Sequence, residues 1–266
     1  MNTLRSLAGA IFVLITEAAG AQVTSFLLPV YTPSYEVTGA SGTRWETDLV
    51  AVNDGAEVPI GPCAPGFGED PLHPCPQAFD RFPAGSAVRN PISFTVTTSA
   101  HGRVFYVKSD EVHSLYLELT LLRNGTPTAH LPVVQDTEFT TGPMELLDVP
   151  VSQLSRTLLR IYGPNNGANE AALVRIYRLP AAGAAAANDL ITEQVVALAQ
   201  EPIGSLAIMP TLPAYAELPI TPTLVGTPPG NLVRIEVTAL DSKPKWAFAT
   251  TVRDSAESVV VITPRR

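Results

Sequence analysis

The sequence predicts an all-β protein built from two tandem antiparallel β-sandwich domains that follow a signal peptide. Apolar and polar residues alternate with a period of two in several stretches, which is typical of half-buried strands. Turn-rich segments separate these stretches, and no amphipathic helix pattern is longer than two turns. A strand followed by an Asn/Gly-rich turn occurs at residues 47–55 and again at residues 157–167, which indicates two similar domains.

Residues 1–21 have the features of a secretory signal peptide. Arg5 supplies the positive start, residues 7–15 form a short apolar run, and residues 19–21 (Ala-Gly-Ala) form a small-residue cleavage site. The alternative, a transmembrane anchor, would need about 20 apolar residues. We therefore expect the mature protein to be secreted or periplasmic.

The net charge restricts the classes of molecule that the protein is expected to bind. The net charge of −8 argues against binding to nucleic acid and against electrostatic binding to anionic lipid.

Cys63 and Cys75 are predicted to pair as a disulfide, because the compartment is expected to be oxidising and closing that loop stabilises the protein by about 3 kcal/mol. A zinc site is the alternative, but two thiols are too few ligands.

The first domain is predicted to span residues 22–142. Its first strand, residues 25–31, contains Pro29, which cannot donate to a ladder and so predicts an edge strand or a strand end. The next strand continues into the turn Asn53-Asp54-Gly55. Its two faces carry Trp45, Thr47, Leu49 and Ala51 on one side, and Arg44, Glu46 and Asp48 on the other.

Residues 57–91 are predicted to form a long proline-rich loop containing the disulfide. Loops of this length are either functional or disordered, and the disulfide favours an ordered one. This loop is our first candidate for a binding surface; the alternative is a crossover between strands that binds nothing.

The remaining strands of the first domain are expected at residues 92–96, 103–108, 113–122 and 129–134. The third of these places Leu115, Leu117, Leu119 and Leu121 on one face. Asn124-Gly125 after it is the strongest short signal for a hairpin turn.

The second domain is predicted to span residues 143–266. It contains an alanine-rich exposed loop at 181–188 and a second proline-rich loop at 202–229, in the same relative place as the first. A C-terminal hairpin is expected from residues 233–239 and 246–252. The other predicted strands lie at residues 146–150, 157–162, 171–179, 191–199 and 259–262.

Three segments resemble a set of uncharacterised secreted bacterial proteins. They are Ser-Gly-Thr-Arg-Trp-Glu-Thr-Asp-Leu at 41–49, Arg-Thr-Leu-Leu-Arg-Ile-Tyr at 156–162, and Trp-Ala-Phe-Ala-Thr-Thr-Val through Val-Ile-Thr-Pro at 246–264. The resemblance implies tandem immunoglobulin-like β domains outside the cytoplasm. It implies no activity and no catalytic residues.

The sequence contains no recognisable catalytic constellation. The histidines lack metal-ligand spacing, there is no phosphate-binding glycine loop, and Ser41 is not in a nucleophile elbow because Thr43 replaces the required glycine. No cofactor is expected, with calcium as the single exception. The oxygen-rich turns that would bind it contain Asn53, Asp54 and Glu57 in the first domain, and Asn166, Asn169 and Glu170 in the second. Ordinary turn chemistry is the alternative explanation.

We therefore expect a non-enzymatic binding or adhesion module, with a protein or glycan partner that meets the loop at 57–91. One alternative is a structural or assembly protein of the cell envelope, in which the domains act as spacers and edge strands allow self-association. A more remote alternative is a hydrolase whose site is assembled from distant residues.

Overall fold

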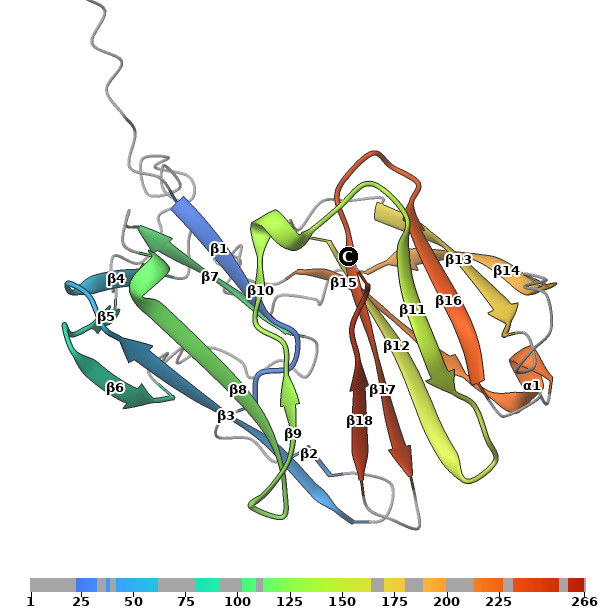
Figure 1. The fold of residues 1–266 in the computed structure, drawn as a ribbon, viewed down its shortest axis with the longest axis horizontal. Coiled ribbons are helices and arrows are strands. Elements are labelled where there is room, and N and C mark those ends of the chain that lie inside the picture. Colours follow the sequence, from blue (N-terminus) through green and yellow to red (C-terminus); the bar gives the residue numbers. More distant parts are fainter. Residues whose placement is uncertain are drawn as a thin grey trace, which may run out of the picture.

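The structure is a computed structural model that describes residues 23–32, 37–38, 42–61, 80–90, 102–108, 112–163, 170–179, 189–199, 213–226, 232–253 and 258–265. Within these ranges the chain is nearly all β, in four antiparallel sheets, which confirms the predicted fold class (Figure 1). Several predictions lie outside the described residues: the signal peptide at 1–21, the Cys63–Cys75 disulfide, the strand at 92–96, the loop at 181–188, and Asn166 and Asn169.

The first unit contains two sheets, which we call sheets I and II. Sheet I has the order β10 (Val134–Gln135), β1 (Val23–Leu28), β7 (Arg103–Lys108), β4 (Val58–Gly61) and β5 (Asp80–Phe82). Sheet II has the order β2 (Val37–Thr38), β3 (Arg44–Asn53), β8 (Leu115–Arg123) and β9 (Thr126–Leu131), and β6 (Ser86–Arg89) also pairs with β3. Two single-turn 3₁₀ helices, η2 (Val112–Ser114) and η3 (Asp136–Glu138), lie between strands.

The second unit contains sheets III and IV. Sheet III has the order β11 (Met144–Pro150), β16 (Leu232–Ala239), β13 (Glu170–Arg178) and β14 (Asp189–Leu198). Sheet IV has the order β15 (Ala214–Ile220), β12 (Ser155–Gly163), β17 (Trp246–Arg253) and β18 (Val259–Ile262), and the short helix α1 (Pro222–Val225) follows β15.

The two units repeat one strand order. The series β1-β7-β4-β5 in sheet I corresponds to β11-β16-β13-β14 in sheet III, and β6-β3-β8-β9 corresponds to β15-β12-β17-β18 in sheet IV. Strands β3 and β12, which carry the repeated sequence pattern, hold equivalent places. The order differs from an immunoglobulin domain, where the first strand pairs with the second; here β1 and β11 pair with β7 and β16. The immunoglobulin-like part of the prediction is therefore not confirmed.

The strands with clear alternation form as predicted. In β3, Thr47, Leu49 and Ala51 are buried, as the period-two pattern predicts; Asp48, on the opposite face, is also buried and pairs with Arg89. The β8–β9 hairpin turns at Asn124 (φ 49°) and Gly125 (φ 76°), where two consecutive positive φ angles give the turn geometry that matches strand twist.

Other predictions are corrected by the structure. The loops predicted at 57–91 and 202–229 contain strands: β4, β5 and β6 in the first, and β15 in the second. These strands are short or contain proline, so they lack the alternation that identifies a strand. The two loops are also not equivalent, because one interruption lies between β4 and β5 and the other between β14 and β15.

Two more corrections concern strand placement. The predicted C-terminal hairpin does not form, since β16 pairs within sheet III and β17 within sheet IV. The intervening turn carries the chain from one sheet to the other. Strand β1 lies inside sheet I, between β10 and β7, and Pro29 follows its end, so the strand-end alternative is the right one.

Each pair of sheets encloses a hydrophobic core. The second core lies between sheets III and IV and includes Leu146, Leu159, Ile176 and Ile235. The first lies between sheets I and II and includes Phe26, Leu49, Phe105 and Leu119. Three aromatic residues of sheet IV also belong to the first core: Tyr162, Trp246 and Phe248. Sheet IV therefore packs on both of its faces.

Candidate functional site

The two faces of sheet IV have different neighbours because side chains alternate along its strands. On β17, Ala247 and Ala249 join the core shared with sheet III, whereas Trp246 and Phe248 turn to the first unit. Six consecutive residues of β17, from Trp246 to Thr251, are consequently buried. The small alanine side chains thus face the core of the second unit, and the large aromatic rings face the first unit.

Tyr162 forms a hydrogen bond between the two units at one end of this contact. Its hydroxyl donates a hydrogen bond of 2.6 Å to the carbonyl oxygen of Pro29, and both residues are buried. Its ring stacks on Phe248 at 6.3 Å, and Trp246 stacks on Phe248 at 5.3 Å. Burial raises the pKa of Tyr162, so the phenol stays protonated and remains a donor.

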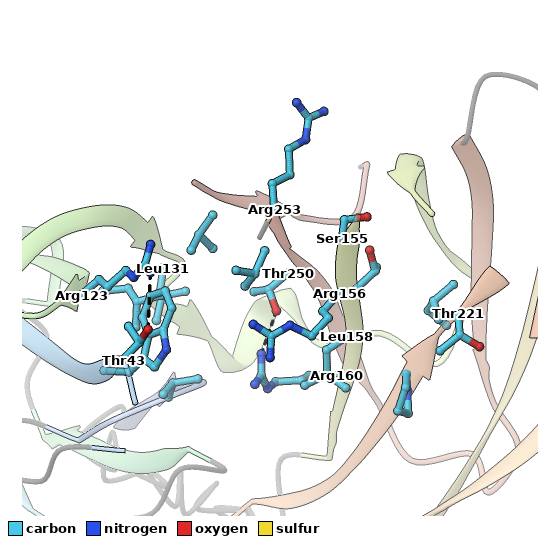
Figure 2. A pocket seen from close by; sticks show the side chains of 18 of the residues that line it. Thr43, Arg123, Leu131, Ser155, Arg156, Leu158, Arg160, Thr221, Thr250 and Arg253 are labelled. Atoms are coloured by element: carbon cyan, nitrogen blue, oxygen red, sulfur yellow. Dashed lines mark hydrogen bonds between the residues drawn. The ribbon is translucent and has the colours of Figure 1, made fainter. Parts of the chain in front are cut away.

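Beyond these aromatic rings the two units separate and leave a cleft of about 960 Å³. One wall is the end of sheet II that extends past the first core, with Trp45, Leu121 and Arg123. The other wall is the outer face of sheet IV, with Leu158 and Arg160 among its residues. Figure 2 shows side chains from both walls projecting into the space between them.

The lining of the cleft is positively charged, although the protein is acidic. Of its 20 residues, ten are apolar, six carry hydroxyls and four are arginines, and none is Asp or Glu. The chain as a whole has 25 acidic and 17 basic residues. A concave surface with one sign of charge and apolar walls concentrates the electrostatic field there.

Arg160 is held firmly in the wall formed by sheet IV. Its Nε donates to Glu217 at 2.8 Å, and a terminal nitrogen donates to the Thr250 hydroxyl at 3.0 Å. The guanidinium also lies over the Phe248 ring, 5.8 Å from its centroid. Glu217 balances its charge, so Arg160 acts mainly as part of the wall.

Arg123 stands on the opposite wall, formed by sheet II. Its guanidinium lies 5.7 Å from the centroid of Trp45 and 3.4 Å from the Thr43 hydroxyl. Figure 2 shows Arg123 beside Thr43, across the cleft from Arg156 and Arg160. Both walls therefore present an ordered guanidinium to the same space.

Arg156 and Arg253 are the exposed arginines of the lining. They come from adjacent strands, where Arg156 is opposite Val252 and Arg253 is opposite Ser155. In Figure 2, Arg156 reaches toward Arg160 and Thr250, whereas Arg253 points outward from the rim. Arg156 therefore faces the interior of the cleft, whereas Arg253 lies at its rim.

The oxygen-bearing residues proposed for calcium have protein partners where the structure describes them. The Asn53 side-chain amide donates to three carbonyl oxygens, and its oxygen accepts from Gly55 and Ser114. Glu57 pairs with Arg81, and Asp54 is exposed in the turn.

Glu170 is fully buried beside Lys245, with 3.1 Å between Oε2 and Nζ. Asp241 accepts from the same amine at 2.9 Å. Calcium would have to displace these partners and those of Asn53. Calcium binding therefore stays a prediction, and within the described ranges no group of three His, Cys, Asp or Glu side chains could hold a metal.

The comparisons with known proteins give no further identification: no family model, curated protein or solved structure matches this chain. The resemblance to secreted bacterial proteins therefore stays a prediction. Among the described residues, no helix has the length and apolar character needed to cross a membrane.

Sequence reasoning did not find the cleft. Its walls come from strands about 110 residues apart, and their contact is a tertiary feature. One signal was present, because the segments that carry the resemblance, 41–49, 156–162 and 246–264, all contribute to the lining.

Proposed function

We propose that this protein is a non-enzymatic binding module that holds its ligand in the cleft between sheets II and IV. The observation that carries the proposal is the lining of four arginines and no acidic residue in a cleft of ligand size. The hydrogen bond from Tyr162 to Pro29 and the shared aromatic core fix the two walls relative to each other. A preformed site of this kind reduces the entropic cost of binding.

The proposal moves the binding surface away from the loop at residues 57–91. The cleft combines apolar contact area with positive charge, whereas the loop is marked only by its prolines and by the predicted disulfide. The loop remains a separate prediction. Deleting residues 61–76 distinguishes the two, since a ligand of the cleft should bind equally well after the deletion.

The test is a thermal-shift screen of the mature protein against matched pairs of anionic and neutral compounds. We expect at least one anionic class to raise Tm in a concentration-dependent way, because ligands that bind the native state stabilise it. The double variant Arg156→Glu/Arg253→Glu should abolish the shift. Arg178→Glu, an exposed arginine at the end of β13 outside the cleft, is the matched control and should leave it unchanged.

Two results would contradict the proposal. One is a ligand whose affinity is unaffected by the double charge reversal. The other is a screen in which neither anionic nor neutral compounds stabilise the protein, which would favour the structural-spacer alternative.

A further inference from the structure

Strand β14 is the edge strand of sheet III next to β13 (Figure 1), and no described strand pairs with its other side along residues 192–198. This open stretch is bounded at both ends. Ile191, just before it, is an extra residue that forms a β-bulge against β13, and Ala199, just after it, pairs with Tyr215 of β15. Between these limits, the backbone N–H and C=O groups that point away from β13 can pair with a further strand.

This edge lacks the features that usually keep edge strands apart. Residues 192–198 (Thr-Glu-Gln-Val-Val-Ala-Leu) contain no proline and no lysine. Their single charged residue, Glu193, is paired with Arg175 of β13, with 2.6 Å between Oε2 and Nε. The opposite edge strand of the same sheet is better protected, since β11 has a bulge at Asp148 (φ 56°) and also pairs with Arg265.

The exposed side chains of β14 are complementary to a second copy of the same strand. Val195, at the midpoint of the open stretch, is 65% exposed, and Glu193 and Ala197 are exposed on the same face. A two-fold axis beside Val195 would place an antiparallel copy with Val195 opposite Val195 and Glu193 opposite Ala197. The two valines then cover each other, and neither carboxylate stands opposite a like charge.

The charge of Glu193 also favours this register over its neighbour. With Val195 at the axis, the Cα atoms of the two Glu193 residues are about 14 Å apart, because four residues along the strand and one strand spacing separate them. An axis at Gln194 would reduce this separation to about 8 Å. Since charges are screened over about 8–10 Å in physiological salt, repulsion between the carboxylates acts mainly against the second register.

Gln194 provides an independent observation on the other face of β14. It lies opposite Val174 of the second core, and its amide nitrogen Nε2 is buried without a hydrogen-bond partner. Such an unsatisfied group costs about 1–3 kcal/mol. With the axis at Val195, the Gln194 side chains of the two copies become diagonal neighbours, within reach of each other. Each amide nitrogen can then donate to the oxygen of the other amide.

We propose that two copies of this chain pair through β14 and join their sheets III into one continuous antiparallel sheet, with the two-fold axis at Val195. Seven residues from each copy form a small contact compared with the roughly 1,200–2,000 Å² of a standard interface, so the dimer is weak and concentration-dependent. None of the residues that line the cleft lies on β14, so this pairing does not depend on the proposed ligand site.

The test is the molar mass of the mature protein, measured by sedimentation velocity from about 1 to about 200 µM. We expect a shift from monomer to dimer as concentration rises. Val195→Lys places two cations opposite each other and should raise the dimer dissociation constant about tenfold or more. Val260→Lys is the matched control, because Val260 is an exposed valine on β18, an edge strand of sheet IV, and it should leave dimerisation unchanged.

Cysteine variants test the register separately, with the wild type as the baseline for the two native cysteines. Val195→Cys should give a disulfide-linked dimer on oxidation, because opposed Cα atoms lie about 4.5–5.5 Å apart, whereas Glu193→Cys should not. A wild type that stays monomeric throughout the range overturns the proposal, as does a dimer that Val195→Lys leaves intact. Equal cross-linking at both positions overturns the axis at Val195.

Discussion

The contact between the two units can be tested by removing a single oxygen atom. In Tyr162→Phe the ring keeps its stacking on Phe248, but the hydrogen bond of 2.6 Å to Pro29 is lost and a buried carbonyl is left without that donor. An unsatisfied buried polar group costs about 1–3 kcal/mol. For a protein of this size, each kcal/mol lowers Tm by about 2–4 °C, so we expect a decrease of roughly 2–12 °C.

Urea unfolding followed by tryptophan fluorescence measures this loss, because Trp246 lies in the same aromatic cluster as Tyr162. Tyr177→Phe is the matched control: Tyr177 is half-buried on β13, in sheet III, and should change stability by less than about 0.5 kcal/mol. If Tyr162→Phe were as stable as this control, the hydrogen bond to Pro29 would not contribute to holding the units together. The contact between the units would then rest on the packing of Trp246, Phe248 and the ring at position 162.

Three further predictions concern the charge cluster behind sheet IV. Lys245→Met should cost about 3–5 kcal/mol in urea unfolding, because it leaves the buried Glu170 carboxylate without the amine that now lies 3.1 Å away. Gly163→Ala should cost about 1–3 kcal/mol, since the new methyl group would overlap the Glu170 carboxylate; combining it with Glu170→Ala should remove most of that extra loss. Burial pushes the pKa of Asp241 upward, but the hydrogen bonds from Lys245 and two backbone N–H groups outweigh it and hold the pKa below its usual value. A lowered pKa stabilises the fold above the unfolded value of about 3.9 and is lost as pH falls through the folded value, so Asp241→Asn should flatten the acid side of a Tm–pH curve.

The sequence predicts a strand correctly where one of its faces is mainly buried and the other is mainly exposed to solvent. Strand β3 and the Asn124-Gly125 turn follow from local pattern alone. The prediction fails where burial is two-sided or strands are short. Trp246 and Phe248 alternate as a strand should, but alternation does not say which core each face joins. The cleft cannot be predicted for the same reason, because no local sequence pattern shows that Trp45 and Arg160 line the same cleft.

A difference between two equivalent sheets explains why the cleft lies where it does. Sheets II and IV share one strand order, yet their outer faces differ. On sheet II that face includes Glu46, Asp48 and Tyr116, and Tyr116 is 61% exposed. On sheet IV the same face is aromatic at one end of the sheet, where it packs against the first unit, and carries arginines and leucine at the other. An apolar face that covered the whole sheet would close the contact completely, and a fully polar one would let the units separate. The mixed face instead fixes the units at Tyr162 and leaves Arg156 and Leu158 facing an open space, which is the arrangement that a binding site requires.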